Sequence, residues 1–438
     1  MNKTALAAAV TLTALANQAT AAFLEDSKAT LTLRNFYYDR NDKNTANNNN
    51  EASEWGQGLI FNYSSGFTEG TVGFGLDAIA LVGLRLDSGG RVGKNGHDRN
   101  PGQLFPVDSD GSAEDSYSKG GVTAKVRLSK TIAQIGTLQP KLPVININDS
   151  RLLPQTYKGG QVTSNEIDRL TLIAGQLEST KTRSSSDDIG MRIAGSSSAA
   201  DTNKFYYAGG DYKITDDLTA QYYYANLEDY YKQHFLGLVH NWKLPVGNLK
   251  TDLRYFNSSS DGKNSSASGR AEGYRSAGYW AAGDSDRGEV DNQTWSALFT
   301  YSLSGHWVSA GYQQISGDSA FPFLNQGDGS TAYLFTNRQI GKFTNAGERS
   351  WVAEYGYDFS AAGVPGLKAS INYVSGDNID AADGDRKEWE RDFRVDYVLQ
   401  EGSFKGLGFT WRNATLRGNN ETDQDENQLF VTYSLPLL

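Results

Sequence analysis

Arginines that recur at alternate positions of several segments are the residues best suited to chemistry in this sequence. Arg34 and Arg40 share one face of "ATLTLRNFYYDR", and Arg127, Arg394 and Arg412 occupy similar places in three other alternating segments. A guanidinium stays charged at physiological pH and binds a carboxylate through two parallel hydrogen bonds. A row of such groups on one face predicts a track that passes a small anion from site to site.

Acidic residues share the same face and leave a second interpretation open. The acids and the remaining bases of this face are Lys125, Lys250, Arg254, Asp77, Asp252, Glu354, Asp358 and Asp396. A wet surface tolerates charges of either sign, and neighbours such as Arg394 and Asp396 could simply balance each other. For any one arginine this is the simpler interpretation, whereas the set as a whole favours the track.

Other catalytic or metal-binding chemistry is thinly represented. The 438 residues include no cysteine, and the four histidines, His97, His234, His240 and His306, lack the spacing of a metal site. No G-x-S-x-G motif marks a hydrolase nucleophile, and no serine–histidine pair stands out. The net charge of −10 argues against nucleic acid as a partner. We therefore expect neither an enzyme nor a bound metal or cofactor.

The first 21 residues have the pattern of a secretory signal peptide. Lys3 supplies the positive charge, residues 5–16 are apolar, and residues 19–21 (Ala-Thr-Ala) form a small-x-small cleavage site. Cleavage near 21/22 leaves 22–438 as one exported domain. The apolar run is too short to span a membrane as a helix. The alternative, a helical N-terminus of a cytosolic protein, lacks an amphipathic pattern.

The elements that must position the arginines are strands, because apolar and polar residues alternate through the whole mature chain. The alternating segments are roughly 9–12 residues long, and a tilted strand needs only about 9–11 residues to cross a bilayer. Nineteen segments qualify, at 160–167 and 188–195 among other places. A closed antiparallel barrel in a bacterial outer membrane needs an even number of strands. We expect eighteen, and these two segments are the weakest candidates.

The connections between these segments are either short or long. Short ones such as 129–132 and 245–248 contrast with long ones such as 87–118, 258–291 and 317–349. This is typical of an up-and-down meander with tight periplasmic turns and large extracellular loops. Lipid allows neither open sheet edges nor irregular exposed backbone, so the sheet must close on itself. We therefore expect an all-β, antiparallel, membrane-spanning barrel.

One long connection contains "NDSRLLPQTYKGG", residues 148–160, which fits neither a helix nor a strand of ordinary length. Apolar residues flank Arg151 and also fill much of 142–147, more than a solvated loop requires. Proline and glycine in this stretch can turn the chain back. We expect the loop to fold into the barrel, where Ser150 and Arg151 would narrow the bore.

A second loop, 317–348, is the expected counterpart of this constriction. Its acidic residues Asp318 and Asp328 would lie opposite the basic wall. The alternative is that the stretch 148–160 packs only on its own hairpin, as surface loops commonly do.

These features occur together in a family that the sequence resembles. The matching stretches extend over essentially the whole mature chain: "FLEDSKATLTLRNFYYDR", "GFTEGTVGFGLDA", "AKVRLSKT", "SRLLPQT", "NLEDYYKQHFLGL", "VPGLKASINYVSGDNID" and "DENQLFVTYSLPLL". In combination they resemble the OprD-like substrate-specific outer-membrane porins of Gram-negative bacteria. The resemblance implies an 18-stranded barrel with a narrow pore, constricted by a loop, that small carboxylate-bearing molecules cross passively.

The resemblance also implies which arginines form the basic ladder of such pores. Arg40, Arg151 and Arg412 match ladder positions on the first strand, in the third extracellular loop and on the penultimate strand. Arg417 aligns with a family arginine too, but its parity differs from that of Arg412, so we expect it at the rim. Thr410 stands where the branch that prefers basic amino acids has another arginine.

Departures from that branch favour a channel for aromatic or other organic acids. Arg394 and Asp396 have their charges swapped relative to it, and "NNEASEW" replaces a stretch with a basic residue. A porin for basic amino acids or peptides is the first alternative, and an outer-membrane enzyme or adhesive barrel is a weaker one. The expected partners are small carboxylates, outer-membrane lipids and lipopolysaccharide, with the barrel acting as a monomer or loose trimer.

Overall fold

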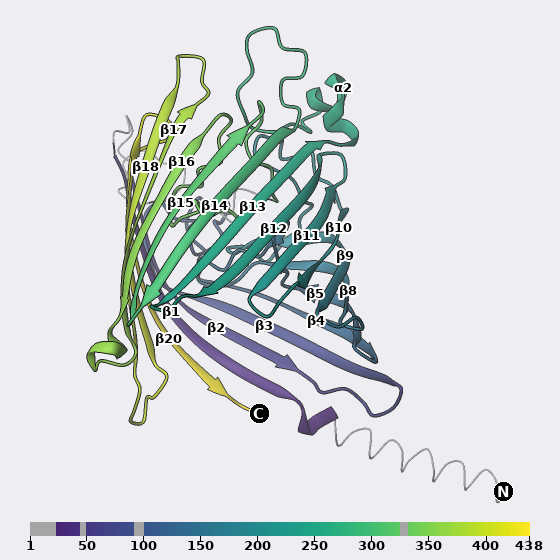
Figure 1. Cartoon of the computed structure of the whole chain (residues 1–438), viewed down its shortest axis with the longest axis vertical. Coiled ribbons are helices and arrows are strands. Elements are labelled where there is room, and N and C mark those ends of the chain that lie inside the picture. Colours follow the sequence, from purple (N-terminus) through teal and green to yellow (C-terminus); the bar gives the residue numbers. More distant parts are fainter. Residues whose placement is uncertain (1–22, 44–49, 92–99, 325–331) are drawn as a thin grey trace, which may run out of the picture.

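The computed structural model describes residues 23–43, 50–91, 100–324 and 332–438, so the expected signal peptide, residues 1–21, lies outside it. The described chain forms one closed barrel of eighteen strands (Figure 1). The barrel strands are β1 (Lys28–Asp42), β2 (Glu51–Ser64), β3 (Val72–Ser88), β4 (Ser116–Leu128), β5 (Thr131–Leu138), β8 (Thr156–Ser164), β9 (Leu170–Lys181), β10 (Phe205–Lys213), β11 (Leu218–Leu227), β12 (Tyr231–Lys243), β13 (Asn248–Ser260), β14 (Asp291–Leu303), β15 (His306–Ser316), β16 (Arg349–Asp358), β17 (Leu367–Ile379), β18 (Arg386–Val398), β19 (Gly408–Gly418) and β20 (Gln424–Pro436).

Each barrel strand pairs antiparallel with the strands before and after it, and the first and last strands close the sheet. β1 pairs with β20 along Thr30 to Asp42. β5 pairs directly with β8, because β6 (Lys141–Leu142) and β7 (Ile145–Asn146) form a separate small hairpin between them. Closure leaves no free edge for lipid to meet. The prediction of an 18-stranded up-and-down barrel is confirmed.

Alternation along the strands separates an outward apolar face from an inward face. On β12, Leu236 and Leu238 are exposed on the outside, whereas Gln233 and Phe235 are buried on the inside. On β1 the face that carries Arg34 points inward and contacts a loop inside the barrel. The period-two pattern of the sequence therefore assigned residues to the correct faces.

Most connections are short at one end of the barrel and long at the other, as predicted, but residues 228–230 form a short connection between β11 and β12 at the end of the long loops. The tightest turns, at 129–130 and 304–305, place Ser129, Ser304 and Gly305 at positive φ, a conformation that two-residue hairpins use. β1 begins and β20 ends at this short-turn end, and the long loops project from the opposite, long-loop end (Figure 1).

Three short helical segments lie in the connections. η1 (Gly262–Ser265) and α2 (Ala267–Ala271) belong to the long loop between β13 and β14, and η2 (Phe359–Ala362) belongs to a short turn. Among the described residues no helix is long and apolar enough to span a membrane.

Of the nineteen candidate strands, 188–195 is the wrong one. Within the loop 182–204, its residues make only isolated bridges, at Ile189 and Met191. Met191 is fully buried in an apolar cluster inside the barrel. The apolar character of this segment thus comes from loop packing and not from a lipid-facing strand. The other weak candidate, 160–167, overlaps β8 and belongs to the barrel.

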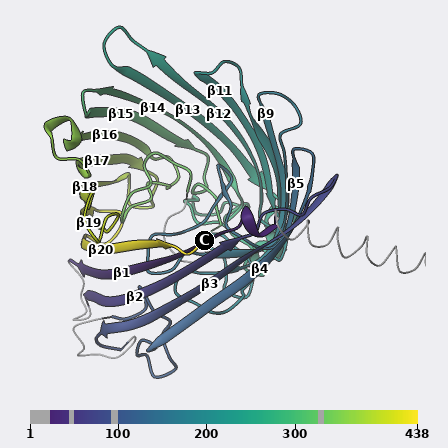
Figure 2. The same cartoon turned by 90° about the horizontal axis from the view of Figure 1, so that it is seen from below.

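The apolar core lies inside the barrel, because long loops fold into it. Figure 2 shows chain segments within the ring of strands. Leu152 of the loop 139–155 is fully buried with the inward-facing Phe36. Ile145 of the same loop packs in a second cluster with residues of the loop 317–348. The stretch around Arg151 therefore folds inward, as expected, and is called here the constriction loop (139–155).

Candidate functional site

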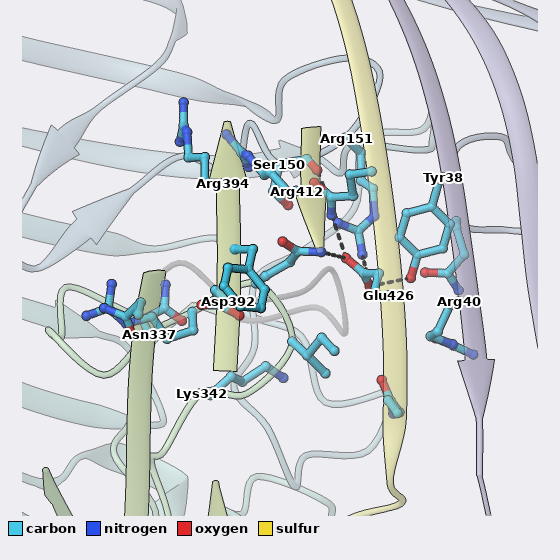
Figure 3. A pocket seen from close by; sticks show the side chains of 18 of the residues that line it. Tyr38, Arg40, Ser150, Arg151, Asn337, Lys342, Asp392, Arg394, Arg412 and Glu426 are labelled. Atoms are coloured by element: carbon cyan, nitrogen blue, oxygen red, sulfur yellow. Dashed lines mark hydrogen bonds and ion pairs between the residues drawn. The ribbon is translucent and has the colours of Figure 1, made fainter. Parts of the chain in front are cut away.

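Strands β1 and β16 to β20, the constriction loop and the loop 317–348 enclose a polar cavity of about 510 Å³, called here the central cavity (Figure 3). Seven cationic and three anionic side chains line it: Arg40, Arg151, Arg183, Arg338, Lys342, Arg394, Arg412, Glu354, Asp392 and Glu426. Its lining is therefore basic, although the chain as a whole carries a net charge of −10.

Several residues predicted from the sequence meet in this cavity. Arg40, Ser150, Arg151, Arg394 and Arg412 all line it, although they come from β1, the constriction loop, β18 and β19. Arg394 and Arg412 are direct partners in the register of β18 and β19. Two guanidiniums thus lie side by side on the inner wall.

These two arginines differ in how far their charge is already neutralised. Arg394 makes two hydrogen bonds, of 2.6 and 2.9 Å, to the carboxylate of Asp396. The Nε of Arg412 has no hydrogen-bond partner among the described residues. Its guanidinium lies 5.2 Å from the ring of Phe430, which stacks on Phe36 at 4.0 Å. The charge of Arg394 is therefore balanced by Asp396, whereas Arg412 can still bind a ligand.

The constriction loop and the loop 182–204 each bring one further arginine to the cavity. The guanidinium of Arg151 lies 4.5 Å above the ring of Tyr38, and its Nη2 is 3.9 Å from Oε2 of Glu426. Arg183, from the next long loop, donates from Nη1 to Oγ of Ser150 at 2.8 Å. Ser150 and Arg151 therefore help to hold a pair of cations at the narrowed bore.

Arg34 does not line the central cavity but holds the constriction loop. Its Nη1 donates to Oδ1 of Asp149 at 2.7 Å and to the carbonyl of Arg151 at 2.9 Å. A longer contact of 3.4 Å reaches the carbonyl of Leu152. Because these partners are Asp149, Arg151 and Leu152, Arg34 acts on the position of Arg151.

Two other predicted arginines lie away from the cavity. Arg127 is exposed, and its guanidinium lies 4.5 Å from the ring of Phe67 in a short turn. Arg417 has the outward parity of β19 and pairs with Asp425 at 2.7 Å, near the long-loop end. It is therefore not part of the inner wall, and the difference in parity from Arg412 already predicted this.

The acidic residues expected in the loop 317–348 do not complete the cavity. Asp318 is absent from its lining, and partial burial together with the charge of Asp291 raises the pKa of Asp318. Asp328 lies outside the described residues. The acids that do line the cavity come from the strands β16, β18 and β20.

Three cations of the cavity were not predicted from the sequence, namely Arg183, Arg338 and Lys342. Arg338 lies 3.9 Å from Glu354, and burial lowers the pKa of both Arg338 and Lys342. The last two belong to "TNRQIGKFTN", a loop stretch that mixes basic and apolar residues as "SRLLPQT" does. This shared composition is the feature of the sequence from which a second inward-folding basic stretch could have been predicted.

The described histidines and acids form no metal centre. No group of three or more His, Asp or Glu side chains there is placed to hold a metal ion. His234 and His306 instead lie within hydrogen-bond distance of Tyr222 and Tyr355. His97 lies outside the described residues.

Comparisons with known proteins agree with this geometry. A family model described as outer membrane porin, OprD family, matches residues 21–437. The porin-like protein GalP of Pseudomonas putida is 35% identical over 441 residues, which cover 99% of this chain and 97% of GalP. The crystal structure of Pseudomonas aeruginosa OccK8 (OprE) has 57% identity and a TM-score of 0.87, covering 95% of this chain and all of the other. That of Pseudomonas aeruginosa OpdK with vanillate has 33% identity and a TM-score of 0.82, covering 94% of this chain and all of OpdK.

Proposed function

This chain belongs to the OprD family of outer-membrane porins, and from that premise we propose that it conducts small carboxylates by passive diffusion. Members of this family are substrate-specific channels of the bacterial outer membrane and not enzymes. The substrates that we propose are aromatic or other organic acids. They would enter from the long-loop end, cross the central cavity and leave at the short-turn end.

The composition of the central cavity is the observation that carries the proposal. Seven cations and three anions line it, and two of the three anions are already engaged. Glu426 accepts a hydrogen bond from Tyr38 at 2.7 Å, and Glu354 accepts one from Trp307 at 2.9 Å. Arg412 keeps an unpaired Nε. A carboxylate can bind such a guanidinium through two hydrogen bonds.

The structurally similar OpdK supports the same class of substrate. Its crystal structure contains vanillate, which combines an aromatic ring with one carboxylate. In the central cavity, the apolar side chain of Ile340 lines the space among the cations. An aromatic acid would thus meet an apolar surface next to the wall cations.

A basic amino acid is the alternative substrate, and one observation favours it. Oδ1 of Asp392, which lines the cavity, has no hydrogen-bond partner among the described residues. An ammonium group could bind there while its carboxylate binds Arg412. The excess of cations nevertheless opposes a substrate with net positive charge.

Permeation through the purified protein tests the proposal. Planar bilayers would be recorded with potassium benzoate on one side and potassium chloride on the other, and then with arginine hydrochloride. We expect the reversal potential to show that benzoate permeates well and that argininium permeates poorly. Argininium permeating better than benzoate would contradict the carboxylate proposal and support the alternative.

A further inference from the structure

We propose that Glu426 of β20 positions two of the inward loops, the constriction loop and the loop 317–348, and thereby sets the bore at the central cavity. Its side chain is only 3% exposed, although it lies on the inner wall of the barrel and lines the central cavity. Figure 3 shows Tyr38 and Arg151 directed toward it. The proposal requires only that the chain is a channel, and it is independent of the carboxylate substrate.

Oε2 of Glu426 contacts the residues that hold the constriction loop. Oε2 accepts a hydrogen bond from the Tyr38 hydroxyl at 2.7 Å and lies 3.9 Å from Nη2 of Arg151. The Tyr38 ring is also the surface on which the Arg151 guanidinium lies, at 4.5 Å. Glu426 therefore fixes Arg151 twice, through its charge and through the orientation of the tyrosine.

Oε1 of Glu426 contacts the loop 317–348. Oε1 accepts a hydrogen bond from Nε2 of Gln339 at 3.1 Å, and Gln428 beside it on β20 donates at 2.5 Å. Gln339 lies between Arg338 and Ile340, and the Ile340 N–H donates to Glu390 on β18 at 2.9 Å. The part of the loop that brings Arg338 into the cavity is thus attached to the wall next to Glu426.

A single carboxylate therefore joins the two loops that narrow the pore. A carboxylate offers only acceptors, and every group that reaches Glu426 is a donor. Glutamine in its place would keep the shape but present an amide NH₂ where donors now converge. Buried donors would then lack an acceptor, and both loops would lose a tie to the wall.

Single-channel recording of the full-length protein in potassium chloride tests this proposal with Glu426→Gln. We expect two changes. The chloride-to-potassium permeability ratio should rise because an anion has gone from a cationic cavity. The fraction of time spent in altered-conductance states should rise about fivefold or more, the effect of losing about 1–2 kcal/mol of stabilisation.

Glu354→Gln is the charge-matched control. It removes one negative charge from the same cavity, but the hydrogen bonds of Glu354 are made with Trp307 and Asn372 on the wall strands. Its link to the loop 317–348 is a single ion pair of 3.9 Å with Arg338, whereas Glu426 is tied to two loops. We expect it to shift the permeability ratio without a comparable rise in altered-conductance states. Equal behaviour of the two variants would overturn the positioning role of Glu426.

Two milder variants keep the proposal testable if Glu426→Gln fails to assemble, which a heat-modifiability gel would reveal. Tyr38→Phe retains the ring beneath Arg151 but removes the hydroxyl, and Gln339→Leu removes the tie of the second loop. Each should raise the frequency of altered-conductance states without changing a charge. If both assemble and conduct as steadily as the wild type, the proposal is wrong.

Discussion

Arg412 is the cavity arginine that we expect to bind a substrate most directly, because no acid is paired with its Nε among the described residues. Its neighbour Arg394 is bound to Asp396, whereas the Nε of Arg412 has no partner among the described residues. We predict that Arg412→Gln weakens carboxylate binding in the pore about tenfold, because a hydrogen bond to a charged group contributes about 1.5–3 kcal/mol. The half-blocking concentration of benzoate against the chloride current measures this.

Arg417→Gln is the matched control for that prediction. It removes the same charge from the same strand, but Arg417 faces outward and pairs with Asp425. Benzoate should block this variant as it blocks the wild type. If the two variants lose affinity equally, the effect comes from the overall charge of the barrel, and Arg412 has no special role.

Glu348 makes the docking of the loop 317–348 sensitive to pH. The carboxyl group is fully buried, and burial together with the negative charge of Glu388 raises the pKa of Glu348 from 4.5 to about 8. Asp380 lies close to the backbone of the same loop end. A raised folded-state pKa means that the folded loop favours the protonated acid. Its stabilisation is complete below 4.5 and is lost as the pH rises through about 8.

We therefore predict that altered-conductance states become more frequent between about pH 7 and pH 9, the window around the raised pKa. Single-channel recording across this range measures the effect. Glu348→Gln cannot ionise, and it should hold the loop equally at all these pH values. A variant that keeps the pH dependence of the wild type would assign the titration to another group.

At the residue scale, the direction of a side chain was predictable but its partner was not. Alternation correctly turned Arg34 and Arg412 toward the bore. It could not show that Arg34 meets Asp149, 115 positions further along the chain, or that Arg412 has no such acid at its Nε. Those partners lie on loops whose paths are not set by a local period.

At the scale of elements, the constriction loop depends on its attachment to β1. Arg34→Gln removes four donor contacts to residues 149, 151 and 152. We predict a rise in altered-conductance states of about fivefold, since losing about 1 kcal/mol changes an equilibrium by that factor. The double variant Arg34→Asp with Asp149→Arg should recover part of the lost stability, because the ion pair is restored.

Arg127→Gln serves as the control, because Arg127 is an inward arginine that lies over Phe67 and not near the loop. It should conduct as steadily as the wild type. If it is as unstable as Arg34→Gln, general loss of lumenal charge would explain both variants and the role of Arg34 in holding the loop would be wrong.

Strands were more predictable than loops for a physical reason. A barrel strand faces lipid on one side and an interior on the other, so its pattern has a period of two. The loop 182–204 packs inside the barrel, so its apolar residues follow no such period. Met191 is buried there, and the apolar residues of 188–195 therefore imitate the pattern of a strand.

At the scale of the whole molecule, the bilayer acts as the solvent of the outer face. Leu429 lies near the middle of β20 (Gln424–Pro436) and is 47% exposed. We predict that Leu429→Arg destabilises the barrel by about 2–4 kcal/mol, whereas Leu437→Arg, beyond the end of the strand, costs about 0–1 kcal/mol. Guanidinium chloride unfolding in liposomes measures both. Equal costs would mean that β20 does not cross the bilayer with Leu429 near its centre.

The period-two pattern was sufficient to predict the all-β class, most of the short and long connections, and which face of a strand points inward. These properties are local, because successive residues of a strand face the lipid and the barrel interior in turn. Which charged side chains form ion pairs or hydrogen bonds, and which have atoms without a partner, depends on the tertiary structure. Arg151, Gln339 and Glu426 are far apart in the chain, and they meet because the barrel closes and two loops fold into it.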